Sequence, residues 1–311
     1  MKIAVLMLVH KNKDQVVRLL SAMNHENIDF FLHVDKKSDL DFSGLNMPNV
    51  YLTPRRHDVG LFEFSMVEAE MELIRTARQQ GHYDYFMLMS GQCYPITSVS
   101  NIYDFLCRSY PEPFIEIVAP TKENYVTRNF AKAFALKRLK IRSYGWLKRH
   151  FSYKGYRLFR YLPGGLAMVA TRIKSLIIGT PVRRLKKRGW GTYCGSQWWI
   201  LPDRIIENVL PFFEDREYHR IVSDCFSCDE TFFQTAIMAR REENGIRTDE
   251  AGNYINRKWF FIFHDGHPIL LTQDRFREIK ESGMLFGRKF DMDQDSEILN
   301  LLDKSFRDED T

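Results

Sequence analysis

The first 120 residues alternate between short apolar runs and segments with helical spacing. The apolar runs have the length of buried strands, and they occupy Lys2–Val9, Phe30–Val34, Val50–Leu52, Tyr85–Met89 and Phe114–Val118. Between these runs, apolar residues recur every three or four positions in Lys13–Met23, Ser65–Ala77 and Asn101–Arg108. Strands that alternate with helices at this spacing predict an α/β fold with a mostly parallel central sheet flanked by helices.

Two of the predicted helices carry polar residues that favour a particular start. Ser65 and Glu68 have the spacing of a capping box at the start of one helix. Further along the chain, Asp229 or Ser227 is in place to cap a helix over the apolar residues that follow. Glu230 would then lie in the first turn of that helix, where negative charge is favourable.

The second half of the chain has a less regular pattern. Strand-like segments occur around Trp198–Trp199 and at Tyr254–Phe263, and helical spacing recurs at Asp203–Phe213 and Thr272–Glu281. The acidic stretch Asp291–Asp295 lacks the glycine and the distal glutamate of a calcium loop. We therefore interpret this stretch as a solvated acidic end and not as a metal site.

Polar residues follow three of the predicted strands, at His10, His33–Lys37 and Ser90–Tyr94. Sheets of this kind bind ligands outside the carboxyl ends of their strands. Asp35 is either an acid that holds ribose hydroxyls or a base edge, or an ordinary turn acid. The chain has neither a G-x-G-x-x-G segment nor a Walker lysine loop, which disfavours dehydrogenases and P-loop enzymes.

The charge of the chain is unevenly distributed. The formal net charge is only +5, yet residues 124–202 contain 18 Lys and Arg and no Asp or Glu. Such a stretch is typical of a surface that meets an anionic partner. An anionic membrane or a phosphate-bearing acceptor fits it, whereas nucleic acid is disfavoured because no known binding module is present. A solvated helical pair packed on the domain is the structural alternative.

Composition places the chain among globular proteins. With 311 residues, 44% of them hydrophobic, it is long enough for a sizeable core. The apolar run at the N-terminus ends at Val9, which is too short for a membrane span, and no cleavage site follows it. The five scattered cysteines predict reduced thiols in a cytoplasmic protein, and the lone pair Cys225 and Cys228 is a weak metal or redox signal.

Two further features suggest chemistry. Glu230 stands beside Asp229 and is either an acid that compensates a helix dipole or a general base at the mouth of a cleft. Trp198 and Trp199 are expected to place one ring in the core and the other toward a cleft. An aromatic ring in a cleft suits the apolar face of a sugar.

Six segments taken together resemble a known family. In chain order they are HVDKKS (33–38), FSMVEA (64–69), LMSGQCYPI (88–96), GSQWW (195–199), DETFFQ (229–234) and FGRKFD (286–291). Each segment is weak alone, but in this order they resemble the core-2/I-branching β-1,6-N-acetylglucosaminyltransferases (glycosyltransferase family 14), in their short bacterial form. The resemblance runs from Met1 to about Asp291 and is poor over the basic stretch.

The resemblance implies one GT-A-type nucleotide-sugar-binding domain over residues 1–311. Its parts would be a nucleotide-binding half (1–120), a basic helical insertion (121–192) and an acceptor and catalytic half (193–311). The resemblance also implies inverting transfer from a UDP-sugar without a divalent metal. In agreement, the strand-end acid Asp35 is followed by two lysines and not by the second acid of a metal-binding D-x-D.

The family's functional residues carry over to matching positions of this chain. The resemblance implies that Glu230 is the base that deprotonates the acceptor hydroxyl and that Lys289 faces the departing diphosphate. The donor-binding residues that it indicates are His10, Asp35, Ser90, Gly91, Arg288 and Lys289. The acceptor-binding residues that it indicates are Trp198, Trp199 and Trp259.

The chain departs from the family pattern in three respects. Cys93 stands where many members have aspartate. The family's second diphosphate cation has no clean match, and His267, Arg257 and Lys258 are the alternatives. The disulfide cysteines and the membrane anchor of animal members are not recognisable, which fits a cytoplasmic bacterial enzyme.

The favoured function is therefore transfer of GlcNAc from UDP-GlcNAc to a hydroxyl of a glycan, with no cofactor. The acceptor would be a bacterial surface polysaccharide or a lipid-linked intermediate, and residues 137–188 would contact an anionic membrane at its inner face. Within the same fold, UDP-xylose or UDP-glucuronate is the alternative donor. Outside it, the alternative is a basic α/β protein that binds membranes or nucleic acid.

Overall fold

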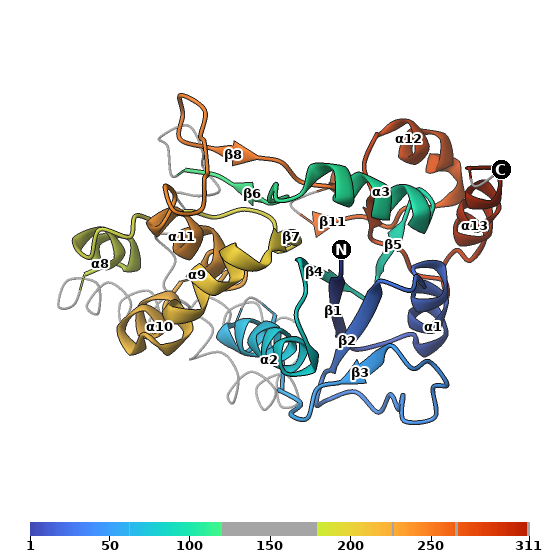
Figure 1. Ribbon diagram of the computed structural model, residues 1–311, viewed down its shortest axis with the longest axis horizontal. Helices are drawn as coiled ribbons and strands as arrows, with labels where there is room; N and C mark the ends of the chain where they lie inside the picture. The colour runs from blue at the N-terminus through green and yellow to red at the C-terminus, as the bar shows by residue number, and fades with distance from the viewer. Residues whose placement is uncertain (62, 120–178, 226, 265–266, 310–311) are drawn as a thin grey trace, which may run out of the picture.

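The computed structural model describes residues 1–61, 63–119, 179–225, 227–264 and 267–309. Its centre is a five-stranded sheet with the order β3-β2-β1-β4-β7 (Figure 1). In this order the strands span Val50–Leu52, Ile28–Val34, Ile3–Val9, Tyr85–Ser90 and Trp199–Pro202. The first four strands are parallel and β7 is antiparallel to β4. The predicted α/β fold with a mostly parallel sheet is confirmed.

Helices cover both faces of this sheet. α1 (Lys13–Ala22) lies on one face and α2 (Phe64–Gln80) on the other (Figure 1). β1 is buried along its whole length because it lies between β2 and β4 and is covered from both sides. α9 (Asp203–Glu214) follows β7 directly and packs against β7 and β4.

The start of α2 differs from the prediction. The helix begins at Phe64, and the preceding Glu63 provides no side-chain cap. The Ser65 hydroxyl instead accepts a hydrogen bond from the Gly60 amide at 2.9 Å. The capping box of Ser65 and Glu68 is therefore wrong, because the serine fixes the loop that enters the helix and not the helix end.

A smaller sheet adjoins the carboxyl end of the large one. It consists of β5 (Cys93–Pro95), β12 (Phe286–Arg288) and β9 (Trp259–Phe260), with β12 in the middle. β12 is antiparallel to β5 and parallel to β9. Since β5 follows β4 closely in the chain, this pairing brings the segment around residue 288 to the end of β4. The predicted turn Ser90–Tyr94 therefore contains the start of a strand.

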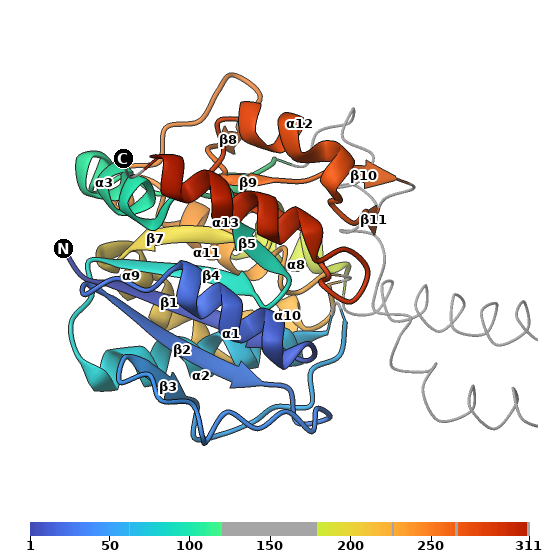
Figure 2. The same ribbon diagram turned by 90° about the vertical axis from the view of Figure 1, so that its right-hand side faces the viewer.

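The C-terminal helix α13 (Glu297–Glu309) returns to the first part of the chain. Figure 2 shows it beside α1. Arg18 of α1 pairs with Asp303 of α13 at 2.7 Å, and the Tyr94 hydroxyl donates to the same carboxylate at 2.6 Å. These contacts tie the end of the chain to α1 and β5.

The remaining elements are short. They are α3 (Val99–Ser109), β6 (Glu116–Ile117), α8 (Pro181–Lys187), α10 (Arg216–Val222), α11 (Phe232–Ala239), β8 (Tyr254–Ile255), β10 (Phe263–His264), β11 (His267–Pro268), a 3₁₀ turn (Gln273–Arg275) and α12 (Phe276–Glu281). β6 pairs with β8, and β10 pairs with β11. The predicted strands at 114–118 and 254–263 are thus broken into shorter pieces, and α10 and α13 were not predicted.

Residues 120–178 lie outside the described residues. Of the predicted basic insertion (121–192) and the predicted membrane-contact region (137–188), only the part from residue 179 onward is described. No helix within the described part is long and apolar enough to cross a membrane. None of the five cysteines forms a disulfide within the described residues, and all but Cys107 are buried.

Candidate active site

Four side chains gather where β1 and β12 end. His10 and Lys11 follow β1, while Arg288 ends β12 and Lys289 follows it. Burial lowers the pKa of His10, and the charges of Lys11, Arg288 and Lys289 lower it further, whereas Asp35 opposes them. An imidazole that is affected by three cations at once lies near all of them. We call Lys11, Arg288 and Lys289 the cation cluster.

Arg288 is held from two sides. Its Nη1 donates a hydrogen bond to Ser90 Oγ at the end of β4. Its guanidinium carbon lies 4.5 Å from the centre of the Trp198 ring, within the range of a cation–π contact. Arg288 is paired with Cys93 across β12 and β5, and the Cys93 sulfur lies 3.5 Å from the Ser90 amide. Cys93 therefore supports the strand end that carries Ser90.

One carboxylate lies against the cation cluster. Asp291 accepts hydrogen bonds from Lys11 Nζ and from Asn12 Nδ2, the latter at 2.7 Å. Burial opposes ionisation, but these bonds hold the pKa of Asp291 below its ordinary value. Burial, together with Arg288 and Lys11, lowers the pKa of Lys289. The prediction of a solvated acidic end is wrong for Asp291, because its side chain is buried and paired.

Gly91, which follows β4, is hydrogen-bonded to β1 and to α1. Its amide donates to the Leu8 carbonyl at 3.1 Å, and its own carbonyl accepts a hydrogen bond from Gln15 Nε2 at 2.8 Å. A Cβ atom at this position would lie 2.8 Å from Cγ2 of Val16, so the site favours glycine. Gln15 also donates to the Phe290 carbonyl at 3.2 Å, which links β4 to the segment after β12.

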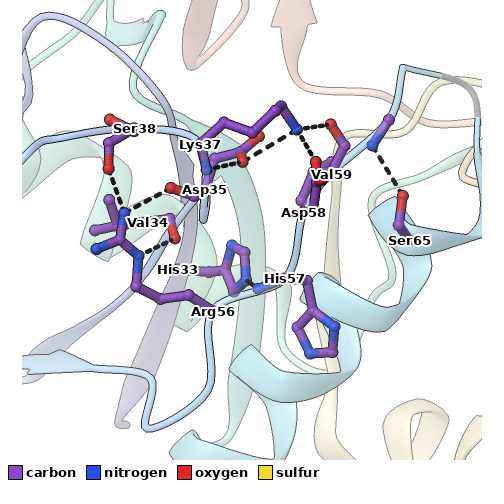
Figure 3. A network of polar contacts seen from close by, with 11 residues as sticks. His33, Val34, Asp35, Lys37, Ser38, Arg56, His57, Asp58, Val59 and Ser65 are labelled. Carbon is purple, nitrogen blue, oxygen red and sulfur yellow. Dashed lines mark hydrogen bonds and ion pairs between the residues drawn. The ribbon is translucent and has the colours of Figure 1, made fainter.

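The end of β2 is fixed by the loop that follows β3 (Figure 3). Asp35 Oδ1 accepts a hydrogen bond from the Lys37 amide at 2.9 Å and lies 3.2 Å from Lys37 Nζ. The Arg56 guanidinium donates to the carbonyls of Val34 and Asp35 at 3.0 and 2.7 Å, and also to the carbonyl of Ser38. The position of Asp35 is therefore defined by its own backbone as well as by its side chain.

A neutral histidine lies in the same network. The His57 amide donates to Nε2 of His33 at 2.8 Å (Figure 3). Burial, with a smaller effect of His57, lowers the pKa of His33 to about 4. His33 is therefore uncharged at neutral pH and its Nε2 is able to accept this bond.

Glu230 lies in a second group of side chains. Burial, together with the charges of Asp229 and Glu116, raises the pKa of Glu230 to about 8, and the neighbouring Ser227 hydroxyl opposes this rise. The Glu230 carbonyl accepts a hydrogen bond from the Gly195 amide at 3.0 Å. A carboxyl group with this pKa is suited to accept a proton near neutral pH.

The turn that carries Glu230 is not the capped helix start that the sequence predicts. α11 begins at Phe232, and the preceding Thr231 provides no side-chain cap. Neither Asp229 nor Ser227 is therefore the N-cap residue. Because Glu230 precedes the first turn of α11, compensation of the helix dipole does not explain its position.

A buried acid on α2, Glu70, lies near Asp229, the neighbour of Glu230 in the chain. Glu70 is fully buried, and its Oε1 accepts a hydrogen bond from Gln197 Nε2 at 2.7 Å. Burial raises the pKa of Glu70 well above its ordinary value, Gln197 opposes this, and the charge of Asp229 adds to it. Glu70 therefore keeps its proton to higher pH than an ordinary glutamate does, and the sequence analysis missed it. We call the following residues the carboxyl cluster: Glu70, Glu116, Asp229 and Glu230.

Two of the three alternatives for a second diphosphate cation have their side chains engaged by other residues. Arg257 Nη1 pairs with Glu116 Oε2 at 3.0 Å, beside the carboxyl cluster. Lys258 Nζ lies over two phenylalanine rings, 5.2 and 5.1 Å from their centres. His267 belongs to β11, and only its backbone is described. Lys11, which the sequence analysis did not select, lies near Lys289, as Arg288 does.

The predicted aromatic platforms are buried. Trp199 and Trp259 are fully buried and pack on Phe233 and Phe286, with ring centres 4.9 and 5.1 Å apart. Neither ring presents a face to a sugar, so the prediction of acceptor binding is wrong for both. Trp198 is 6% exposed, and a guanidinium lies over its ring.

Comparison with known families identifies the chain. Residues 3–256 match the family model of the Core-2/I-Branching enzyme. The chain belongs to this family. A search of curated proteins finds no match. As a core-2/I-branching enzyme, the protein is placed among the glycosyltransferases, which act on a sugar donor and an acceptor.

Part of this core-2/I-branching enzyme's site lies beyond the matched residues. The match includes His10, Asp35, Ser90 and Glu230 but ends before β12. The structure nevertheless brings the end of β12 to Ser90, because β12 pairs with β5. The cation cluster is therefore built from both ends of the chain.

Proposed function

We propose that this core-2/I-branching enzyme is an inverting glycosyltransferase that moves a sugar from a UDP-sugar to a hydroxyl of a glycan. GlcNAc is the favoured sugar, and the whole chain would form one GT-A-type domain. The observation that carries the proposal is the cation cluster, in which Asp291 pairs with Lys11 and acts on Lys289, while Arg288 is held by Ser90 and Trp198. Surplus positive charge at the carboxyl end of a parallel sheet favours an anionic ligand such as a diphosphate.

The cation cluster also supports a reaction without a divalent metal. Negative charge grows on the diphosphate as its bond to the sugar breaks, and fixed cations stabilise that charge. Arg288 and Lys289 would supply this stabilisation, and Lys11 would be the further cation. Asp35, at the neighbouring strand end, would hold the ribose or the base of the nucleotide.

Glu230 is the proposed general base. In one displacement, the acceptor oxygen bonds to the anomeric carbon while the bond from that carbon to the UDP oxygen breaks. The hydroxyl proton passes to Glu230. With a pKa of about 8, Glu230 binds that proton more strongly than an exposed carboxylate does.

Calorimetry with nucleotides tests the donor side. The protein is titrated with UDP, UDP-GlcNAc, UDP-xylose and UDP-glucuronate, each in EDTA and in manganese. We expect UDP and one UDP-sugar to bind equally well in both buffers, and Lys289→Ala to weaken binding by about tenfold or more. A requirement for manganese would contradict the role of the cation cluster. Failure of every nucleotide to bind would overturn the proposed function.

Glu230→Gln separates the enzyme from a basic protein that only binds membranes or nucleic acid. We expect turnover to fall by about 10²- to 10⁴-fold, because the amide accepts no proton. UDP affinity should stay unchanged, because no member of the cation cluster contributes to the pKa of Glu230. Glu242→Gln, at an exposed position, is the matched control and should keep full turnover. Full turnover in Glu230→Gln would contradict the assignment.

We infer further that the acceptor is a glycan on a lipid diphosphate at the inner face of an anionic membrane. The described end of the basic stretch supports this. Arg184 of α8 and Arg188, which follows α8, form ion pairs with acidic residues in and after α10. Arg183, Lys186 and Lys187 are exposed and have no ion pair with any described residue. Their spacing places these three charges on one side of the helix.

A further inference from the structure

The segment Gly195–Trp198, which we call the bridging segment, contacts both clusters. At its first residue, the Gly195 amide donates to the Glu230 carbonyl at 3.0 Å. At its third residue, Gln197 Nε2 donates to Glu70 Oε1 at 2.7 Å. The bridging segment is therefore attached to the carboxyl cluster at two points.

Close packing fixes the start of the bridging segment. A Cβ atom on Gly195 would lie 1.8 Å from the backbone oxygen of Glu116, so only glycine fits there without a shift of the backbone. Gln234 Nε2 donates to the Ser196 carbonyl at 2.9 Å from α11. The segment is thus held between β6 and the helix that follows Glu230.

The other end of the bridging segment contacts Arg288. The Trp198 ring centre lies 4.5 Å from the guanidinium carbon, and the same guanidinium donates to Ser90 Oγ. The positive charge of Lys289 lies nearby and repels Arg288. Without the ring and the hydroxyl, this repulsion would favour turning the guanidinium toward solvent.

We propose that Trp198 is a positioning residue for the donor, which holds Arg288 toward the diphosphate, and that it does not bind the acceptor. The proposal rests on the proposed function, because it assigns the diphosphate to Arg288. Trp198 is 6% exposed and Arg288 lies over its ring, which leaves little surface for a sugar. Arginine suits this place because its planar group stacks on a ring and donates hydrogen bonds from its edge at the same time.

UDP calorimetry on Trp198 variants tests this assignment. We expect Trp198→Leu to weaken UDP binding by about tenfold, the effect of losing a desolvated cation–π contact. Trp198→Phe keeps an aromatic ring and should weaken binding by about threefold or less. Trp190→Leu is the matched control, since that ring packs on Tyr218 and should leave UDP affinity unchanged.

A double-mutant cycle tests whether Trp198 acts through Arg288. Arg288→Met should weaken UDP binding, and adding Trp198→Leu to it should cause little further loss. Thermal unfolding of each variant shows that it is folded. If the leucine variant does not fold, the same cycle is carried out with Trp198→Phe.

The possible results distinguish the positioning role of Trp198 from the proposed function. If wild-type protein binds UDP and the Trp198 variants bind it equally well, the positioning role is overturned while the proposed function stands. If Trp198→Leu weakens binding as much in the Arg288→Met background as in wild type, the effect does not pass through Arg288 and the proposal is also overturned. If wild type binds neither UDP nor a UDP-sugar, the proposed function fails, and this inference fails with it.

Discussion

At the scale of single residues, the neighbours of Glu230 set the pH at which the proposed base works. Its pKa of about 8 predicts that kcat/KM rises with pH until Glu230 is ionised. Glu116→Gln removes one of the charges that raise this pKa and frees the cation of Arg257. We expect the midpoint of the pH profile to move to lower pH by roughly half a unit or more.

Steady-state rates from about pH 5.5 to 9.5 measure this midpoint, a range that brackets the expected pKa. Glu242→Gln, at an exposed position, should leave the profile of wild type unchanged. A midpoint that stays in place or moves to higher pH in Glu116→Gln would show that Glu116 does not influence the base.

Single residues also show what the sequence alone could and could not predict. The location of His10, Asp35 and Ser90 at one edge of the sheet was predictable, because polar residues that end or follow buried parallel strands meet there. Trp199 and Trp259 were not, because aromatic residues fill cores as readily as they line clefts, and only their partners decide.

The sequence analysis missed Glu70, although its position on the apolar side of α2 was visible in the sequence. It lies four residues after Met66 and three before Leu73, both on the apolar side of α2. A carboxylate on the buried side of a helix requires a partner, and in this fold Gln197 provides it.

At the scale of elements, the segment after β12 is fixed to the start of α1 by one side chain, that of Asp291. Asp291 connects it to Lys11 and Asn12, before α1. We expect Asp291→Asn to lower the free energy of unfolding by about 1–3 kcal/mol, since it removes a buried charge-assisted contact. Urea unfolding followed by tryptophan fluorescence measures this change. Asp293→Asn, at an exposed position nearby, should change it by less than about 0.5 kcal/mol.

The same contact predicts the direction of a pH effect. The folded-state pKa of Asp291 is lower than its ordinary value of 3.8. Its contribution to stability is therefore present above that value and is lost as the pH falls through the folded-state pKa. Asp291→Asn should show no such loss, and the two proteins should approach each other in stability under acid conditions. A constant difference at every pH would contradict this explanation.

The longer elements followed from periodicity, whereas the short ones did not. β1, α1, β2 and α2 lie within a few residues of their predicted bounds, because their apolar patterns extend over several residues or turns. The sheet β5-β12-β9 is made of strands of two or three residues from distant parts of the chain. Such strands have no local pattern, and their pairing is decided only by tertiary packing.

At the scale of the whole molecule, the uneven charge predicts where the protein meets a membrane. We expect the triple variant Arg183→Glu, Lys186→Glu and Lys187→Glu to bind vesicles of phosphatidylglycerol and phosphatidylcholine about a hundredfold more weakly. Each basic residue near an anionic surface contributes about 1 kcal/mol. Co-sedimentation with the vesicles measures the binding, and vesicles of phosphatidylcholine alone should bind neither protein.

The control is an equal change of charge elsewhere. Arg241→Glu, Arg247→Glu and Lys304→Glu alter three exposed positions outside α8, and this variant should bind nearly as well as wild type. Equal weakening by both sets of changes would show that only the net charge matters. Unchanged vesicle binding by the α8 variant would overturn the proposed contact with the membrane.

The overall architecture was the most predictable level. Alternating strands and helices lead to a parallel sheet covered on both faces, since parallel strands need crossover connections. The position of the candidate site followed from the same rule. The cation cluster did not, because it requires β12 to pair with β5 across about two thirds of the chain.

Glu70 makes folding a proton-linked reaction. Its carboxyl group has an ordinary pKa of 4.5 in the unfolded chain and a much higher pKa in the folded protein, because it is buried. The folded protein therefore keeps this proton over a range of pH in which the unfolded chain has lost it. The contribution of this residue to stability declines by about 1.4 kcal/mol per pH unit between the unfolded and folded pKa values. The contribution of Glu70 to the heat of unfolding will accordingly vary with the ionisation enthalpy of the buffer, and this residue favours the fold more in acidic than in alkaline solution.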